Sequence, residues 1–302
     1  MSSSEHSMTV VRSARRVGAW LAAALWLAGC ARTPVETPIA FLAQAGGTWQ
    51  VWVMPQAGAE PRRVGQLSED VARLSWFPDG KALLVNLQDG RLMKVDATSG
   101  NAIPINVPVS GILDAVVSPD GMHIAYSVSM GESTDRNDIW TLNIASGATQ
   151  KITAIPGLQH EPVWSSDGKT IYFLSGRGGQ FHDIWQVDIA SRATTQLTVN
   201  ELYHFDIAAR DDGTLVYSSN RGGHYDLWQR AAKGKSERLT DDAALDARPS
   251  WSPDGLRIVF ESTRGGASNL WVYDTKRKAI NRLTNVPNGA RMPVWAPAGG
   301  AR

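Results

Sequence analysis

Short runs in which apolar and polar residues alternate recur along the chain after residue 38. One unit shows the pattern clearly, with four such runs at residues 162–165, 170–175, 183–188 and 194–197. A period of two residues is typical of a strand with one buried face, and no segment after residue 30 has a convincing helical period. The pattern therefore predicts an all-β protein made of four-stranded units.

Three sequence marks repeat with these units. An Asp-Gly pair, which tolerates the positive φ of a tight hairpin turn, recurs at intervals of 41, 47, 45 and 42 residues, beginning at Asp79, Asp120, Asp167, Asp212 and Asp254. An apolar residue followed by Trp or Met comes after each pair, at residues 92–93, 139–140, 184–185, 227–228 and 270–271, and once before the first pair, at residues 51–52. An aliphatic residue followed by threonine ends four units, at Thr153, Thr198, Thr240 and Thr284. Four strands per unit and a period near 43 residues indicate the blades of a β-propeller.

The two ends of the chain set the number of blades. Five complete units begin near Val71, Ile112, Gln159, His204 and Asp246. Residues 39–64 supply strands two to four of another unit, and residues 290–297 supply only a first strand. Together the two fragments predict one blade closed from both ends, and thus a six-bladed propeller over residues 39–302 without an exposed sheet edge.

The tryptophans follow the same repeat. Nine of the ten tryptophans beyond residue 29 fall in two repeat columns, strand one and strand three. Large rings at these positions are expected to pack between blades rather than to bind a ligand. Trp49 fits neither column, and the sequence alone does not place it.

The repeat over residues 249–271 resembles that of a known family. Its sequence is PSWSPDG at 249–255, IVFESTRGG at 258–266 and NLW at 269–271, similar to the WD40-like repeat of TolB-type propellers, and the resemblance covers nearly all of residues 39–297. TolB itself is a soluble periplasmic protein whose propeller follows an α/β domain and binds a peptide segment of the lipoprotein Pal. We expect no such domain here, so the resemblance implies protein or peptide binding without implying the same role.

The N-terminal segment reads as an export signal. Three arginines precede an uncharged run over residues 17–28, which is shorter than the about 20 apolar residues needed to cross a bilayer. The run ends in Leu-Ala-Gly-Cys at residues 27–30, which resembles the lipobox of bacterial lipoproteins. That resemblance implies a lipidated Cys30, a signal peptide over residues 1–29 and a tether over residues 30–38. Ala31 follows the cysteine in place of the aspartate that retains enteric lipoproteins at the inner membrane, which implies the outer membrane.

Composition bears on the partners more than on the fold. Removal of residues 1–29 leaves 27 basic and 28 acidic residues. Since no basic excess remains to neutralise phosphates, nucleic acid is not an expected partner. The remaining 273 residues suit one propeller, which we expect to be monomeric.

One repeat column carries a concentration of charge. Alignment on the Asp-Gly pairs places six residues near the start of the first strands: Arg73, Asp114, Glu161, Asp206, Arg248 and Met292. First strands line the central channel of a propeller, so these residues are expected to form a ring at one mouth, where three acids face two arginines. His160, His204, Asp246 and Arg291 lie beside them in the alignment. Convergent charge of this kind could hold a partner peptide, a small ligand or a Ca²⁺ ion.

A purely structural interpretation of this column is also open. Arg177 and Arg221 end the second strands of the units that carry Glu161 and Asp206, so each acid could form a salt bridge within its own blade. Enzyme activity has less support, because the chain has no G-x-S-x-G motif and its histidines share neither a repeat column nor H-E-x-x-H spacing. Apart from Ca²⁺ in the channel, no metal or cofactor is expected.

The sequence thus supports two hypotheses. The first is a lipid-anchored envelope protein at the outer membrane, facing the periplasm, that binds a protein or peptide through the propeller face and channel mouth. The second is a periplasmic enzyme that acts on a glycan or another small molecule at the same mouth.

Overall fold

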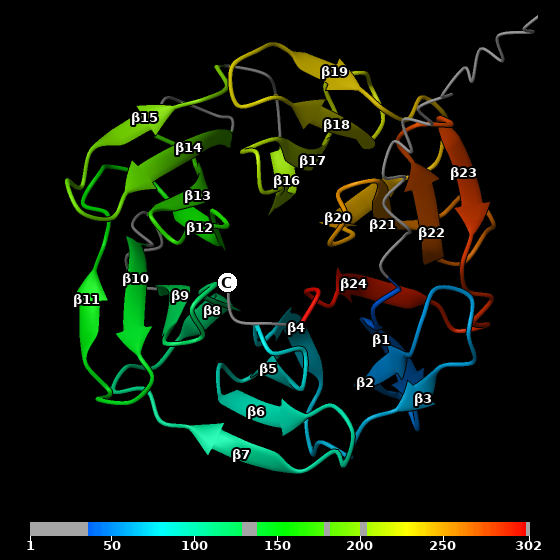
Figure 1. Cartoon of the computed structure of the whole chain (residues 1–302), viewed down its shortest axis with the longest axis horizontal. Helices are drawn as coiled ribbons and strands as arrows, with labels where there is room; N and C mark the ends of the chain where they lie inside the picture. The colour runs from blue at the N-terminus through cyan, green and yellow to red at the C-terminus, as the bar shows by residue number, and fades with distance from the viewer. Residues whose placement is uncertain (1–35, 129–137, 178–181, 200–203, 300–302) are drawn as a thin grey trace, which may run out of the picture. The chain divides into compact units, whose positions relative to one another are not determined.

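The computed structural model describes residues 36–128, 138–177, 182–199 and 204–299. These residues form 24 strands that pair into six antiparallel sheets of four strands each. Figure 1 shows the sheets as blades around a common axis, with the first strand of each blade innermost. The predicted all-β, six-bladed propeller is therefore confirmed.

Five blades each contain four strands that are consecutive in the sequence. Blade 1 consists of β4 (Val71–Trp76), β5 (Ala82–Leu87), β6 (Leu92–Asp96) and β7 (Ala102–Ile105). Blade 2 consists of β8 (Ile112–Val117), β9 (His123–Val128), β10 (Asp138–Asn143) and β11 (Thr149–Lys151). Blade 3 consists of β12 (Gln159–Trp164), β13 (Thr170–Ser175), β14 (Asp183–Asp188) and β15 (Thr194–Gln196). Blade 4 consists of β16 (His204–Ala209), β17 (Leu215–Ser219), β18 (Asp226–Arg230) and β19 (Ser236–Arg238). Blade 5 consists of β20 (Asp246–Trp251), β21 (Arg257–Ser262), β22 (Asn269–Asp274) and β23 (Ala279–Arg282).

Blade 6 joins the two ends of the propeller, as the sequence predicts. Its strands are β24 (Ala290–Trp295), β1 (Ile39–Ala45), β2 (Thr48–Met54) and β3 (Arg62–Arg63), in the order β24-β1-β2-β3. The antiparallel register pairs Ile39 with Trp295 and Ala43 with Ala290. Beyond the ladder, the Thr37 hydroxyl donates to the carbonyl of Ala296 at 2.9 Å, and the Ala296 amide donates to Pro38 at 2.8 Å. The closing strand is therefore held along its whole length.

The hydrophobic core consists of layers between neighbouring blades. Each of six buried clusters joins two adjacent sheets; for example, Ala125 and Ile139 of blade 2 pack with Ile171 and Phe173 of blade 3. All nine tryptophans of the two repeat columns belong to these clusters or pack against them, so their predicted position between blades is confirmed. In the part of the chain that the structure describes, no helix is long and apolar enough to span a membrane.

The Asp-Gly pairs turn the chain from the first strand to the second, as predicted. At Gly121 the backbone adopts φ 71°, which glycine reaches without steric cost. The preceding Asp120 accepts the Met122 amide through Oδ1 at 2.8 Å, which fixes the turn. These turns gather at the ends of the first strands, so the starts of the first strands lie at the opposite end of every blade.

Candidate functional site

Six residues surround the propeller axis, one from each innermost strand. They are the third residues of the first strands, and we call them the axial ring: Arg73, Asp114, Glu161, Asp206, Arg248 and Met292. The strand register shifts beside each of them, so the axial ring lies in six β-bulges. β-bulges re-aim side chains and are common next to functional sites. The ring predicted from the sequence is thus present in the structure.

Five members of the axial ring have a left-handed backbone. Their φ angles lie between 50° and 55°, and only Arg73 has a negative φ. For residues other than glycine this conformation is disfavoured by roughly 1–2 kcal/mol, so the surrounding contacts must hold it. In this position the side chains of Asp114 and Glu161 reach the backbone of the following blade.

The carboxylates of the axial ring bind backbone amides of the next blade. Asp114 accepts the Glu161 amide through Oδ2 at 3.3 Å, and Glu161 accepts the Asp206 amide through Oε2 at 2.5 Å. In blade 5, where the ring residue is Arg248, Glu261 of β21 accepts the Met292 amide at 3.1 Å instead. The bulges therefore form part of the contact between blades 2, 3 and 4 and between blades 5 and 6.

The arginines of the axial ring flank the row of three acids. Arg73 Nη1 lies 3.2 Å from Asp114 Oδ1, and Arg248 Nε lies 3.8 Å from Asp206 Oδ1. Arg248 Nη1 also contacts Glu261 Oε1 at 2.5 Å. Acids on blades 2 to 4 therefore form an arc with one arginine at each end.

The salt bridges considered within single blades do not form among the described residues. Arg177 lies over the ring of Trp185 at 5.3 Å, and Arg221 lies over Trp228 at 5.0 Å. Both arginines stack on the third strand of their own blade, a favourable cation–π contact. Glu161 and Asp206 pair with residues of the axial ring and with His160 instead.

The axial ring moves the pKa values of two neighbouring acids in opposite directions. Burial opposes ionisation of Glu161, but the hydrogen bond from His160 and the charge of Arg73 outweigh it and hold the pKa of Glu161 below its ordinary value. Burial, together with the negative charge of Glu161, raises the pKa of Asp206 to about 7. Near neutral pH the axial ring therefore exchanges a proton at Asp206 while Glu161 stays ionised.

Two of the predicted residues lie beside the axial ring with partly accessible side chains. His160 Nε2 lies 2.8 Å from His182 Nδ1, and His160 Nδ1 lies 3.5 Å from Glu161 Oε1. Arg291 stacks on the indole of Trp49 at 3.8 Å from the ring centroid. Burial and the nearby charge of Arg248 lower the pKa of Arg291.

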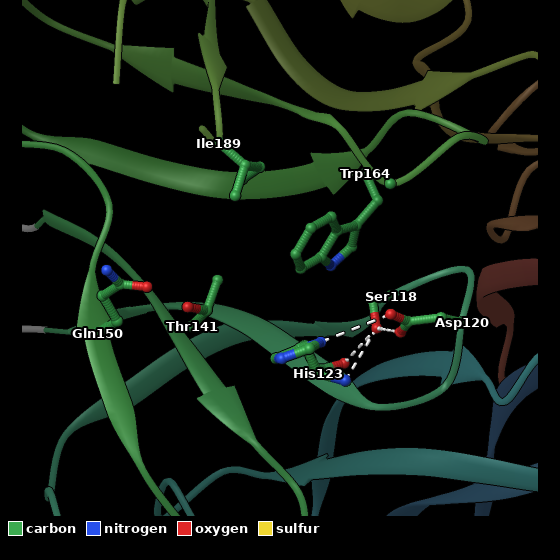
Figure 2. A pocket seen from close by; sticks show the side chains of 8 residues that line it. Ser118, Asp120, His123, Thr141, Gln150, Trp164 and Ile189 are labelled. Atoms are coloured by element: carbon green, nitrogen blue, oxygen red, sulfur yellow. Dashed lines mark hydrogen bonds and ion pairs between the residues drawn. The ribbon is translucent and has the colours of Figure 1, made fainter. Parts of the chain in front are cut away.

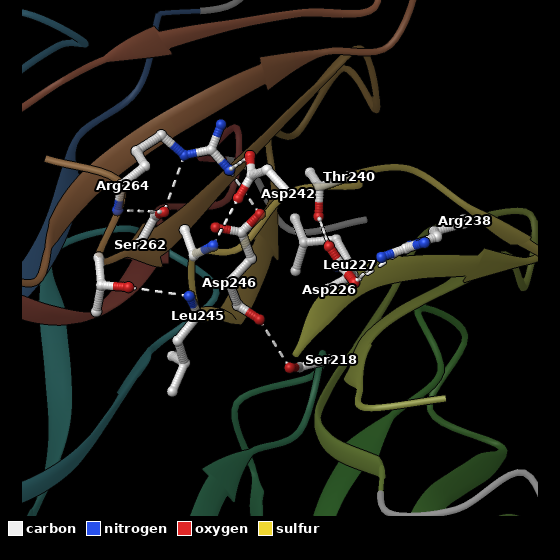
Figure 3. Close-up of polar contacts among 12 residues, drawn as sticks. Ser218, Asp226, Leu227, Arg238, Thr240, Asp242, Leu245, Asp246, Ser262 and Arg264 are labelled. Carbon is white, nitrogen blue, oxygen red and sulfur yellow. Dashed lines mark hydrogen bonds and ion pairs between the residues drawn. The ribbon is translucent and has the colours of Figure 1, made fainter. Parts of the chain in front are cut away.

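The structure places His204 and Asp246 in the protein interior, where their side chains are not accessible to a binding protein. Both are fully buried at the starts of their strands. Burial and the charge of Arg221 lower the pKa of His204 to about 4, so the imidazole is neutral at pH 7. Asp246 accepts the guanidinium of Arg264 at 2.6 Å, and Asp242 meets the same guanidinium at 3.3 Å (Figure 3). Asp246 links blades 4 and 5, since its backbone carbonyl accepts the hydroxyl of Ser218 at 2.8 Å. His204 packs edge-on against Tyr217 within blade 4, with 4.9 Å between the ring centroids.

Sequence reasoning missed three residues that complete the site. Glu261 replaces an axial-ring acid from the second strand, and alignment of the first strands alone could not reveal it. His182 belongs to the loop before β14, and Trp49 belongs to the hairpin of blade 6; neither repeats in other blades. In the residues the structure describes, no group of three or more His, Cys, Asp or Glu side chains is arranged to hold a metal ion.

Comparison with known proteins agrees with this architecture. Residues 115–299 match the family model of the TolB beta propeller domain. The chain belongs to this family. It is 27% identical over 265 residues to the Tol-Pal system protein TolB of Bordetella parapertussis, covering 87% of this chain and 60% of that protein. It is 33% identical to an uncharacterised protein of Agrobacterium fabrum, covering 79% of this chain and 66% of that protein.

The solved TolB structures share the fold. TolB from Acinetobacter baumannii superposes with a TM-score of 0.78 at 22% identity, covering 88% of this chain and 68% of that structure. The chain spans 60% of the length of the TolB relative from Bordetella, which is less than two thirds, and the likeness concerns the propeller.

Proposed function

We propose that this TolB-like protein is a lipid-anchored binding protein of the cell envelope. Residues 1–29 act as the signal peptide, Cys30 carries the lipid, residues 30–38 form the tether and the propeller occupies residues 39–302. The protein lies at the outer membrane facing the periplasm, and it engages a protein or peptide without catalysing a reaction. The Leu-Ala-Gly-Cys sequence at residues 27–30 and the similarity to Tol-Pal system proteins support this proposal.

The observation that carries the proposed binding of a partner is the left-handed backbone of the axial ring. Five residues are held in a conformation that costs roughly 1–3 kcal/mol each, a form of strain that is concentrated at binding and active sites. Blade 1 forms the same four-stranded sheet with a negative φ at Arg73, so the blade architecture does not require this conformation. Four of the five strained positions carry a charged side chain at the axis: Asp114, Glu161, Asp206 and Arg248.

The surface around the axial ring suits a polypeptide more than a small ligand. Arg291 offers a cation stacked on Trp49, His160 offers an imidazole beside His182, and Leu113 of β8 is 43% exposed. Aromatic, cationic and apolar groups spaced around an axis are the elements that anchor a peptide or loop.

Capture from envelope extracts tests the proposal. The lipidated protein, the His160→Ala/Arg291→Ala variant and a Lys276→Ala control would be used as bait in detergent extracts. The bulge amides donate to Asp114, Glu161 and Glu261, and not to His160 or Arg291, so we expect the double variant to stay folded. Lys276 is exposed in the turn after β22. Loss of a specific protein with the double variant alone supports the proposal. Equal capture by all three proteins would show that the partner does not bind at the axial ring.

The opposed pKa values of Glu161 and Asp206 favour one alternative function. Two adjacent carboxyl groups with pKa values pushed apart can act as base and acid, as in enzymes that cleave glycans. A periplasmic enzyme acting on a glycan or small molecule would turn over substrate with a pH profile that Asp206→Asn flattens. No turnover by the wild-type protein across a glycan panel would eliminate this alternative.

A further inference from the structure

A small pocket opens between blades 2 and 3, at the ends of the blades that carry the Asp-Gly turns. Its volume is about 180 Å³, and Figure 2 shows the indole of Trp164 facing the turn that contains Ser118, Asp120 and His123. Thr141, Gln150, Gly168 and Ile189 complete the lining. Pockets for whole small molecules usually exceed about 300 Å³, so this one has room for a single side chain.

The interface between blades 5 and 6 contains the same turn with its pocket filled. Ser252 to Arg257 repeats the pattern of Ser118 to His123, so Arg257 stands where His123 stands in blade 2. The guanidinium of Arg257 lies 4.8 Å from the ring centroid of Trp295, the tryptophan equivalent to Trp164. Between blades 4 and 5, Arg210 lies at the same distance from Trp251. At both interfaces the protein places an arginine on this tryptophan.

The shorter histidine leaves the acid of the turn exposed. The side chain of Asp254, beside Arg257, is 3% exposed, whereas that of Asp120, beside His123, is 52% exposed. Burial opposes ionisation of Asp120, but hydrogen bonds from Ser118 and the Met122 amide, and the nearby His123, lower the pKa of Asp120. His123 Nδ1 lies 3.6 Å from Asp120 Oδ2, and the carboxylate remains half exposed. The pocket thus combines an accessible carboxylate with an indole face on which no cation is stacked among the described residues.

We infer that this pocket binds an arginine side chain of a protein partner, with the guanidinium stacked on Trp164 and paired with Asp120. The Trp164 indole is already oriented, since its Nε1 donates to the carbonyl of Val116 at 3.3 Å. Thr141 and Gln150 provide oxygen acceptors for the remaining N–H groups. Because the axial ring lies at the opposite ends of the blades, this second site is independent of the proposed function.

Titration of the Trp164 indole N–H by NMR tests the inference. Nα-acetyl-arginine amide should shift this signal saturably, with a millimolar dissociation constant, whereas the citrulline analogue, which has the same shape without the charge, should not. A peptide with a central arginine should bind more tightly than free L-arginine, because flanking residues add contacts at the surface. Equal shifts with citrulline, or free L-arginine binding as tightly as the peptide, would overturn the inference.

Two variants make the test specific. His123→Arg supplies the missing guanidinium from within the chain, as Arg257 does, and should abolish the shift while the melting temperature stays equal or rises. Met122→Arg adds the same charge at a neighbouring side chain that is 62% exposed, and should leave the titration unchanged. An undiminished titration in folded His123→Arg protein would show that arginine binds elsewhere.

Discussion

The hydroxyl of Thr198 donates a hydrogen bond to Asp183 Oδ1 at 3.0 Å and accepts the Ile184 amide at 2.9 Å. Thr198 lies two residues after β15, the fourth strand of blade 3, and Asp183 begins the third strand, β14. Thr284 and Asn269 repeat the arrangement at 2.9 Å in blade 5. Two of the three sequence marks are therefore the two halves of one buried contact.

Replacement of Thr198 by valine should show how much this contact contributes to the free energy of unfolding. The change keeps the shape but removes the hydroxyl that donates to the Asp183 carboxylate and accepts the Ile184 amide, and loss of these two buried hydrogen bonds should lower the free energy of unfolding by roughly 1–3 kcal/mol. Urea denaturation would measure it. Thr195→Val, at an exposed position of β15, is the matched control. An equal loss of stability in both variants would show that the buried contact of Thr198 does not stabilise the protein.

Asp206 should make stability depend on pH. Because its pKa is raised to about 7 from an ordinary value of 3.8, the folded protein retains a proton that the unfolded chain has released. The free energy of unfolding therefore falls as pH rises between these two pKa values, and the full cost of ionising Asp206 is present above pH 7. Asp206→Asn removes this cost, so relative to wild type the variant should gain roughly 1–3 kcal/mol between about pH 5 and about pH 8.

Asp114→Asn provides the contrast for that experiment. Asp114 pairs with Arg73 and accepts the Glu161 amide, so loss of its charge should lower the free energy of unfolding by about 1 kcal/mol at both pH values. Chemical denaturation at the two pH values would measure both variants. A gain for Asp206→Asn that does not change with pH would mean that this carboxyl group titrates normally.

Closure of the ring should depend on β24. Deletion of residues 289–302 removes the partner of β1 and exposes an unpaired, largely buried strand edge, so we expect aggregation on expression. Deletion of residues 298–302 keeps every hydrogen bond of β24 and should leave a monomer. Size-exclusion chromatography with light scattering distinguishes the two, and a monomeric product of the longer deletion with unchanged melting would refute the closure argument.

A close backbone approach at Gly100 should make this position intolerant of a side chain. A Cβ added there would lie 2.6 Å from the Cα of Gly65. This close approach brings the blade 1 turn that contains Gly100 against the chain at the end of blade 6. Gly46 has a similar positive φ but nothing within 4 Å of an added Cβ. Gly100→Ala should therefore cost roughly 1–3 kcal/mol more than Gly46→Ala in thermal denaturation. Equal effects would indicate that only backbone strain matters.

Cys30→Ser should release the protein from membranes. The change removes the only thiol of the chain, so lipidation cannot occur. We expect loss of acyl labelling and transfer from the detergent-extracted membrane fraction to the soluble fraction. Thr33→Ser, in the proposed tether, should partition as wild type does. Unchanged membrane partition of Cys30→Ser would refute the lipid anchor.

The sequence predicted the blades because their determinants are local. Alternation with a period of two, Asp-Gly turns and the column of threonines each act within a few residues, so the units beginning at Val71 and Asp246 could be placed to the residue. The closing blade was predicted by counting the strands at the two ends of the chain.

The candidate site was predicted only in part, because its geometry depends on neighbouring blades. The column containing Glu161 and Asp206 was found, but the positive φ of these residues results from contacts with the next blade, which no single repeat encodes. A salt bridge between Arg177 and Glu161 was considered because both residues lie in blade 3. In the structure Arg177 instead lies over Trp185, which offers a larger surface for stacking. Trp49 could not be placed, since its partner Arg291 lies at the other end of the chain.

Blade 6 also has a mechanical consequence. Any tension on a tether attached before residue 39 enters the propeller at Ile39, which is hydrogen-bonded on one side to β2 and on the other to β24. A pull on the membrane side would thus be shared by two ladders, and the strand that carries the load is the one that closes the ring. If the proposed anchor at Cys30 is pulled, opening of the propeller would begin at the seam between β1 and β24.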